Sequence, residues 1–230
     1  MCNPAQFTAP AQPVPMLLYY ITDRKQFGGS AADQQQKVLE KICECAAADV
    51  DYVQLREKDL TTGELEQLAA RAMAVIPSGS TTRFLINSRI DVALACGAHG
   101  VHLPANSLSA SEARAIFARA GKSHAVIGIS THSAAEVASA EAHGADFAVS
   151  GPVFEKAGVP NPTGLSQLAG MARCSMPVLA VGGITLKNVK QCLEGGAAGF
   201  AAIRMFQQID VKATVSALRR LRVASTFAGS

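Results

Sequence analysis

The feature that most constrains the fold is an alternation of short apolar segments with longer amphipathic ones, repeated eight times along the chain. The short segments are rich in β-branched residues and predict strands, whereas the longer ones carry apolar residues at helical spacing, such as Val38, Leu39 and Ile42. Strand–helix alternation is typical of parallel strands with helical crossovers. Eight such units in 230 residues predict a single (βα)8 TIM barrel, an α/β fold. A doubly wound open sheet is the alternative.

The predicted boundaries follow from these patterns and from local end signals. The strands are expected at 17–22, 52–56, 83–87, 100–104, 125–130, 146–151, 177–183 and 199–203. The helices are expected at 33–48, 61–75, 90–97, 109–121, 133–144, 164–174, 185–196 and 210–222. Helix N-caps are predicted at Thr61 or Thr62, Ser109 and Ser133, and glycine ends at Gly97, Gly121 and Gly144. The barrel would then cover 16–223, between a flexible tail at 1–15 and a frayed end at 224–230.

Composition excludes several classes of function. A net charge of +3 with scattered basic residues does not favour nucleic-acid binding. No apolar run approaches the roughly 20 residues that span a bilayer, so no membrane partner is expected. The start of the chain lacks the basic region of a signal peptide, which predicts a cytoplasmic protein. The six cysteines are therefore expected to be free thiols.

Active-site groups of a TIM barrel come from the carboxyl ends of its strands. Arg56 and Lys58 have the same parity where the second strand ends, so both can face one side and bind a phosphate or carboxylate. A solvated pair beside Glu57 and Asp59 is the alternative. The other substrate-binding candidates at strand ends are Gln54, Asn87, Ser130 and Gly151. The long connection 152–163 exceeds ordinary loop lengths and is a candidate functional loop.

The segment AVGGIT at 180–185 points to phosphate binding. Gly182 and Gly183 allow backbone N–H groups to approach an anion, and Thr185 can cap the helix that follows. A tight turn that needs positive φ is the alternative. Arg204, after the eighth strand, lies where this architecture commonly holds phosphate, although a rim ion pair would also suit it.

His132 is the histidine at a predicted strand end with polar residues on both sides, and it is the candidate general acid–base. A structural role, beside a helix cap at Ser133, is the alternative. His102 lies between Val101 and Leu103 and is read as an ordinary pleat position.

Several motifs together resemble the thiamine phosphate synthase/TenI superfamily. They are VQLREK, LIN-x-R-x-DVAL, G-VHL, IG-ISTHS, GPVF, PVLAVGGIT and GGAAGFAAI, and they span about 17–210. The resemblance implies a TIM barrel of thiamin biosynthesis that binds a small phosphorylated heterocycle. The synthase branch joins a pyrimidine pyrophosphate to a thiazole phosphate, and the TenI branch includes metal-free thiazole tautomerases.

Departures from the synthase pattern favour the TenI branch. The resemblance implies that two aspartates of synthases bind Mg²⁺, and Ser88 and Ser107 stand at those positions here. The pyrophosphate signature after the sixth strand is also absent, although Lys156 is present. We therefore expect a metal-free tautomerase with no cofactor, in which His132 transfers the proton. A synthase, which alone would need magnesium, and a non-catalytic sensing barrel are the alternatives. A homo-oligomer is left open.

Overall fold

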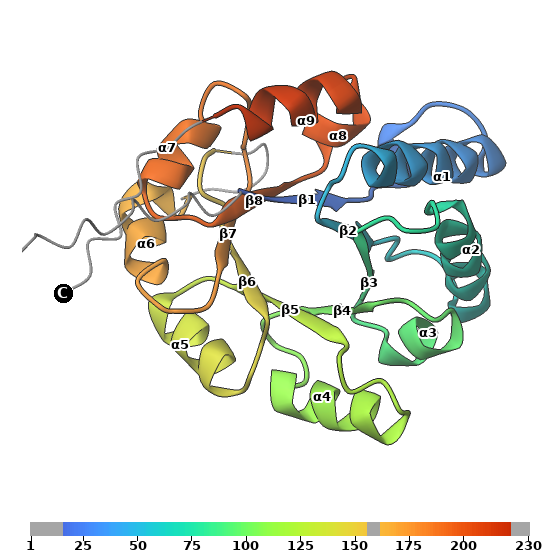
Figure 1. Ribbon diagram of the computed structural model, residues 1–230, viewed down its shortest axis with the longest axis horizontal. Coiled ribbons are helices and arrows are strands. Elements are labelled where there is room, and N and C mark those ends of the chain that lie inside the picture. The colour runs from blue at the N-terminus through green and yellow to red at the C-terminus, as the bar shows by residue number, and fades with distance from the viewer. Residues whose placement is uncertain (1–15, 156–161, 222–230) are drawn as a thin grey trace, which may run out of the picture.

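Eight parallel strands close into a barrel in the computed structural model, which describes residues 16–155 and 162–221 (Figure 1). The expected tails at 1–15 and 224–230, and Lys156, lie outside the described residues. The TIM barrel is confirmed, because β1 pairs with β2 on one side and with β8 on the other. The strands are β1 (Leu17–Ile21), β2 (Tyr52–Leu55), β3 (Arg83–Asn87), β4 (Gly100–Leu103), β5 (Val126–Thr131), β6 (Phe147–Ser150), β7 (Val178–Val181) and β8 (Gly199–Ala202).

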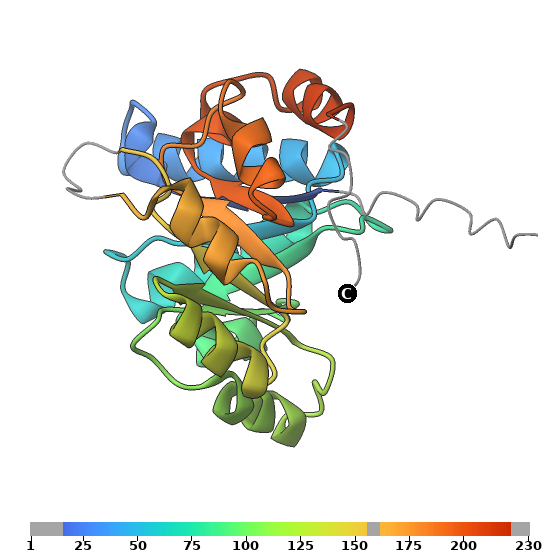
Figure 2. The same cartoon turned by 90° about the vertical axis from the view of Figure 1, so that its left-hand side faces the viewer.

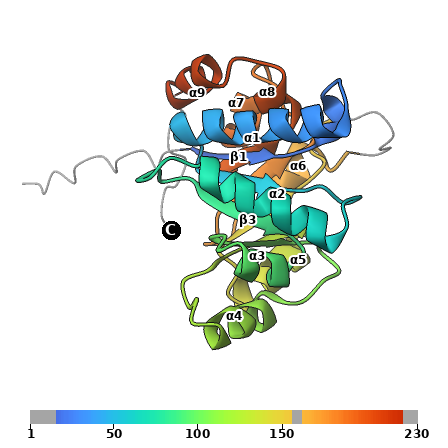
Figure 3. The same ribbon diagram turned by 90° about the vertical axis from the view of Figure 1, so that its right-hand side faces the viewer.

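Helices cover the outside of this ring. Figure 3 shows α1, α2 and α3 side by side, and Figure 2 shows the opposite side with α5, α6 and α7. The helices are α1 (Ala31–Ala47), α2 (Thr62–Val75), α3 (Ile90–Ala95), α4 (Ala110–Arg119), α5 (Ala134–Ala142), α6 (Gly164–Met171), α7 (Val189–Glu194), α8 (Arg204–Gln207) and α9 (Val211–Arg219). No helix in the described ranges is long and apolar enough to cross a membrane.

The local end signals explain where most helices begin and end. Thr61 and Ser109 each form a reciprocal capping box with the glutamate three residues later, and the Ser133 hydroxyl accepts from the Glu136 N–H. Gly97, Gly121 and Gly144 adopt positive φ just after their helices, as predicted.

One local expectation is corrected, and the structure adds two short elements that the sequence pattern does not predict. Helix α7 begins at Val189 rather than at Thr185, so Thr185 caps nothing; its N–H instead donates to Asn188 Oδ1 at 2.7 Å. A 3-10 turn, η1 (Arg24–Gln26), follows β1, and α8 follows β8. Helices this short leave too few periodic positions for a sequence pattern.

The core has two layers, because alternate strand residues point to opposite faces. The larger layer packs the outer strand faces against the helices, and the smaller one fills the barrel. The interior cluster contains Tyr19, Ile21, Leu85, Phe147, Val149, Leu179 and Ala201. Tyr19, Tyr52 and Phe147 have ring centroids 4.6–5.7 Å apart, so aromatic packing closes the interior.

The two ends of the described chain are tied together. The Arg219 guanidinium near the end of α9 donates to the carbonyl of Met16, just before β1. It also donates to the carbonyl of Asp49 and pairs with the Asp51 carboxylate at 2.8 Å. One side chain therefore joins the first and last elements. The five described cysteines, Cys43, Cys45, Cys96, Cys174 and Cys192, are free thiols, as predicted.

Candidate active site

Three polar side chains, joined by hydrogen bonds, lie at the carboxyl ends of β2 and β3. Gln54 Nε2 donates to Asn87 Oδ1 at 3.0 Å, and Asn87 Nδ2 donates to Ser88 Oγ at 3.0 Å. Ser88 adopts φ +63°, a left-handed conformation that side chains other than Asn and Asp rarely take. The predicted candidates Gln54 and Asn87 are thus brought together, and both present neutral amides.

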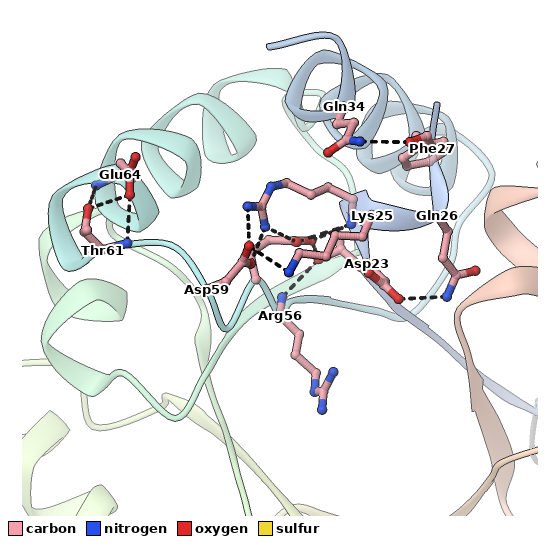
Figure 4. Close-up of polar contacts among 12 residues, drawn as sticks. Asp23, Lys25, Gln26, Phe27, Gln34, Arg56, Asp59, Thr61 and Glu64 are labelled. Atoms are coloured by element: carbon pink, nitrogen blue, oxygen red, sulfur yellow. Dashed lines mark hydrogen bonds and ion pairs between the residues drawn. The ribbon is translucent and has the colours of Figure 1, made fainter. Parts of the chain in front are cut away.

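A buried ion-pair network lies beside them, between the ends of β1 and β2 (Figure 4). Glu57 is 5% exposed and binds the Arg24 guanidinium at 3.0 Å and the Thr22 hydroxyl at 2.6 Å. Burial raises the pKa of Glu57, and the hydrogen bonds from Thr22 and Arg24 oppose that rise. Arg24 also binds both Asp59 oxygens and holds the pKa of that carboxyl well below its usual range.

This network decides how Arg56 is presented. Both neighbouring carboxylates are bound by Arg24, and no carboxylate among the described residues forms an ion pair with Arg56. The Arg56 N–H donates to Thr22 Oγ1 at 3.0 Å, while its side chain extends away from the network (Figure 4). Position 56 continues the inward parity of Tyr52 in β2, and the Arg56 charge makes the smaller contribution to the lowered pKa of His102 inside the barrel. Arg56 is half-buried, so its phosphate-binding role and the solvated alternative both stay predictions.

The other predicted cations are less enclosed. Lys58 is exposed, one strand repeat beyond Arg56. Arg204 is exposed as well, and it opens helix α8 rather than lying in a loop. Neither forms an ion pair with a described carboxylate, so the expected rim ion pair of Arg204 is not present in that part of the chain.

His132 continues the inward parity of β5 at the rim. Its Nδ1 lies 3.0 Å from the carbonyl oxygen of Gly151, which can only accept, so Nδ1 carries the proton. The other ring nitrogen, Nε2, is then an acceptor in the neutral imidazole. The backbone N–H of His132 donates to Glu136 at 2.8 Å, which ties His132 to the first turn of α5.

The glycines that directly follow β7 and β6 permit a close approach of two segments. Gly182 and Gly183 have φ of +90° and +67°, and a Cβ on them would lie 2.4 Å from Pro152 and 2.7 Å from Phe154. Gly151 has the same constraint, because its Cβ would lie 2.1 Å from the Val181 carbonyl oxygen. The positive-φ turn is therefore present. No hydrogen bond from the amide of Gly182 or Gly183 to a loop or turn carbonyl is found among the described residues, and anion binding at these amides stays a prediction.

Sequence reasoning missed a series of buried, hydrogen-bonded side chains inside the barrel. The Tyr19 hydroxyl lies 3.1 Å from His102 Nδ1, and His102 Nε2 lies 2.9 Å from Ser130 Oγ. Burial, with a smaller effect from Arg56, lowers the pKa of His102 to about 3. Gly128 makes room for this ring, because a Cβ there would lie 3.0 Å from His102 Nδ1 and 2.4 Å from Phe147. The sequence signal that could have revealed this contact is that His102 has inward parity and lies opposite Gly128 in the neighbouring strand.

The donors at these rims do not fit a magnesium ion. Mg²⁺ takes carboxylate and phosphate oxygens, but positions 87, 88 and 107 supply an amide and two hydroxyls. The Asn87 side-chain oxygen already accepts a hydrogen bond from Gln54. No cluster of three histidine, cysteine or acidic side chains suited to a metal is present in 16–155 and 162–221.

Comparisons with known proteins place the chain in a family. A family model described as thiamine monophosphate synthase matches residues 18–206. A thiamine-phosphate synthase of Halalkalibacterium halodurans is 38% identical over 78% of this chain and 83% of its own length. One of Methanoregula boonei is 35% identical over 92% of this chain and 94% of its own.

A solved structure agrees with these matches. The thiamine phosphate pyrophosphorylase from Pyrococcus furiosus superposes with a TM-score of 0.73 and is 28% identical, covering 89% of this chain and 94% of that one. Sequence and barrel geometry thus lead to one conclusion: the chain belongs to the thiamine monophosphate synthase (TMP-TENI) family.

Proposed function

We propose that this protein is a thiamine-phosphate synthase, which joins a pyrimidine pyrophosphate to a thiazole phosphate and releases pyrophosphate. The observation that carries the proposal is the similarity to relatives of that name over most of their length. The proposal reverses the order of preference that the sequence motifs favour, and it makes the enzyme a transferase in thiamine biosynthesis rather than an isomerase.

The rim residues have roles that suit this chemistry. The amides of Gly182 and Gly183 would hold the thiazole phosphate, with Arg204 as a further cation. Arg56 and Lys58 would hold the pyrophosphate and neutralise the charge that develops as it leaves. The Arg24 network supports this role because it binds the carboxylates that would otherwise compete for Arg56. Gln54 and Asn87 would offer amide contacts to the pyrimidine.

The experiment supplies both substrates to the purified full chain and measures thiamine phosphate and released pyrophosphate, with added Mg²⁺ and with EDTA. We expect product, and we expect Arg56→Gln to raise KM for the pyrophosphate substrate at least tenfold, since a lost charged hydrogen bond is worth about 1.5–3 kcal/mol. Arg119→Gln, on the exposed end of α4, is the matched control and should leave KM unchanged. No product under either metal condition would refute the synthase.

Proton transfer on a thiazole carboxylate phosphate is the second candidate, and the neutral donors at the rims of β3 and β4 favour it. A tautomerase needs a base but no metal, and His132 Nε2 is an acceptor held in place through Nδ1. We expect His132→Ala to lower a tautomerase rate about 10²–10⁴-fold while ligand affinity is kept.

One measurement separates the candidates. Incubation with thiazole phosphate in deuterium oxide, followed by NMR, detects exchange of a ring-adjacent proton. Exchange without formation of thiamine phosphate from both substrates would favour the tautomerase. Binding with neither reaction would identify a sensing barrel and refute both enzymatic proposals.

A further inference from the structure

A single file of hydrogen-bonding side chains crosses the barrel from its core to its mouth. It runs from Tyr19 on β1 to His102 on β4 and on to Ser130 on β5, with steps of 3.1 and 2.9 Å. Tyr19 is fully buried and His102 is 3% exposed, whereas Ser130 is partly exposed. The file therefore connects a dry interior to the place where a substrate would lie.

The surroundings of Tyr19 give the file a direction. The phenol lies against the rings of Tyr52 and Phe147, and burial raises its pKa well above the usual value, so it keeps its proton. His102 Nδ1 is the acceptor that the described residues offer to this hydroxyl. If Nδ1 instead carried the proton, the Tyr19 hydroxyl would lose that acceptor in an apolar environment, which is strongly unfavourable.

The direction passes through the imidazole. His102 is neutral in this interior, so it carries one ring proton. With Nδ1 accepting from Tyr19, that proton is on Nε2 and is donated to Ser130 Oγ. Ser130 Oγ thus accepts a hydrogen bond from His102 in the barrel interior. The Ser130 hydroxyl proton is then left to be donated toward the mouth, at the carboxyl ends of the strands.

We propose that Tyr19 and His102 are positioning residues that make Ser130 a hydrogen-bond donor toward an anionic oxygen of the bound substrate. Ser130 would then select ligands that present an acceptor, such as a phosphate or pyrophosphate oxygen, over ligands that present a donor at the same place. The inference rests on the proposed function only for the identity of that anion, because the direction of the file belongs to the protein alone.

The first test is the tautomer of His102, measured by ¹⁵N NMR on the full chain without substrate. We expect the proton on Nε2 in the wild-type protein. Tyr19→Phe removes the donor to Nδ1 and should shift the ring toward the other tautomer. Tyr52→Phe removes a neighbouring phenol with no bond to His102 and is the matched control. A proton on Nδ1 in the wild type, or a tautomer that ignores Tyr19→Phe, would overturn the inference.

The second test is affinity for inorganic pyrophosphate, measured by calorimetry. Ser130→Ala should weaken binding at least tenfold, in line with a hydrogen bond to a charged group. His102→Leu should do the same. His102→Gln should retain most of the affinity, because an amide can also accept on one side and donate on the other. A merely structural role predicts equal losses for the two His102 variants, and that result would refute the positioning role.

These measurements stand apart from the synthase assay. One outcome is a protein that makes no thiamine phosphate but shows the expected His102 tautomer and the expected order of pyrophosphate affinities among the variants. That outcome would refute the proposed reaction and support the positioning role of Tyr19 and His102. A synthase whose wild-type His102 carries its proton on Nδ1 would do the reverse.

Discussion

Acid should destabilise this protein through His102 in particular. The buried ring has a pKa of about 3 against 6.5 for an ordinary histidine, so the unfolded chain binds a proton that the folded chain excludes. A folded pKa below the unfolded one gives stability that is complete above pH 6.5 and is lost as the pH falls toward 3. Linkage gives a loss of about 2 kcal/mol between pH 7 and pH 5 from this one group.

The assay is the free energy of unfolding in urea at half-unit steps from pH 7 to pH 5, for the wild type and for His102→Gln. Other titrating groups act on both proteins, including Glu57, whose raised pKa has the opposite sign, so the difference between the curves isolates His102. We expect that difference to narrow by about 2 kcal/mol over this range.

A matched control is Val149→Ala, which truncates another side chain of the barrel interior but removes no titrating group. It should lower stability by about 2 kcal/mol at every pH. The difference in unfolding free energy between the wild type and Val149→Ala should not change with pH. If the difference between the wild type and His102→Gln is equally independent of pH, His102 is not held neutral by burial and the reasoning fails.

Three further predictions follow from the rim and the interior. Gly128→Ala should cost about 1–3 kcal/mol in urea unfolding, because its Cβ would lie 2.4 Å from Phe147, whereas Gly170→Ala meets no neighbour and should cost nothing. Ser88→Asn should raise stability by about 0.5 kcal/mol, since Asn adopts positive φ more readily, and an equal gain from Ser107→Asn would contradict this origin. Glu57→Gln should lower the free energy of unfolding by about 2 kcal/mol and raise KM for the pyrophosphate substrate. Asp59→Asn, whose wild-type side chain is 41% exposed, should lower the free energy of unfolding by about 0.5 kcal/mol. Similar losses of stability in the two variants would show that burial does not set the difference.

The fold was within reach of the sequence because its signals are local. Apolar periodicity located every strand of the barrel, and capping pairs such as Ser109 with Glu112 located helix starts to within a residue or two. The same reasoning misplaced Thr185 as a cap, because Asn188 competes for its backbone N–H.

The site was less accessible because its partners are distant in sequence. Arg24 meets Glu57 across 33 residues, and Tyr19 meets His102 across 83, so neither contact leaves a pattern in a short window. Parity predicts that Arg56 faces the inside of the barrel, but it cannot say that Arg24 binds the nearby carboxylates of Glu57 and Asp59.

The Arg219 contact also bears on chain order. Because one side chain spans from α9 to the residue before β1, a short added linker could join these ends while the chain is opened at another loop. Every strand pair of the closed ring, including β1 with β8, would be kept in such a circular permutant. The eight units would then fold from a different starting strand.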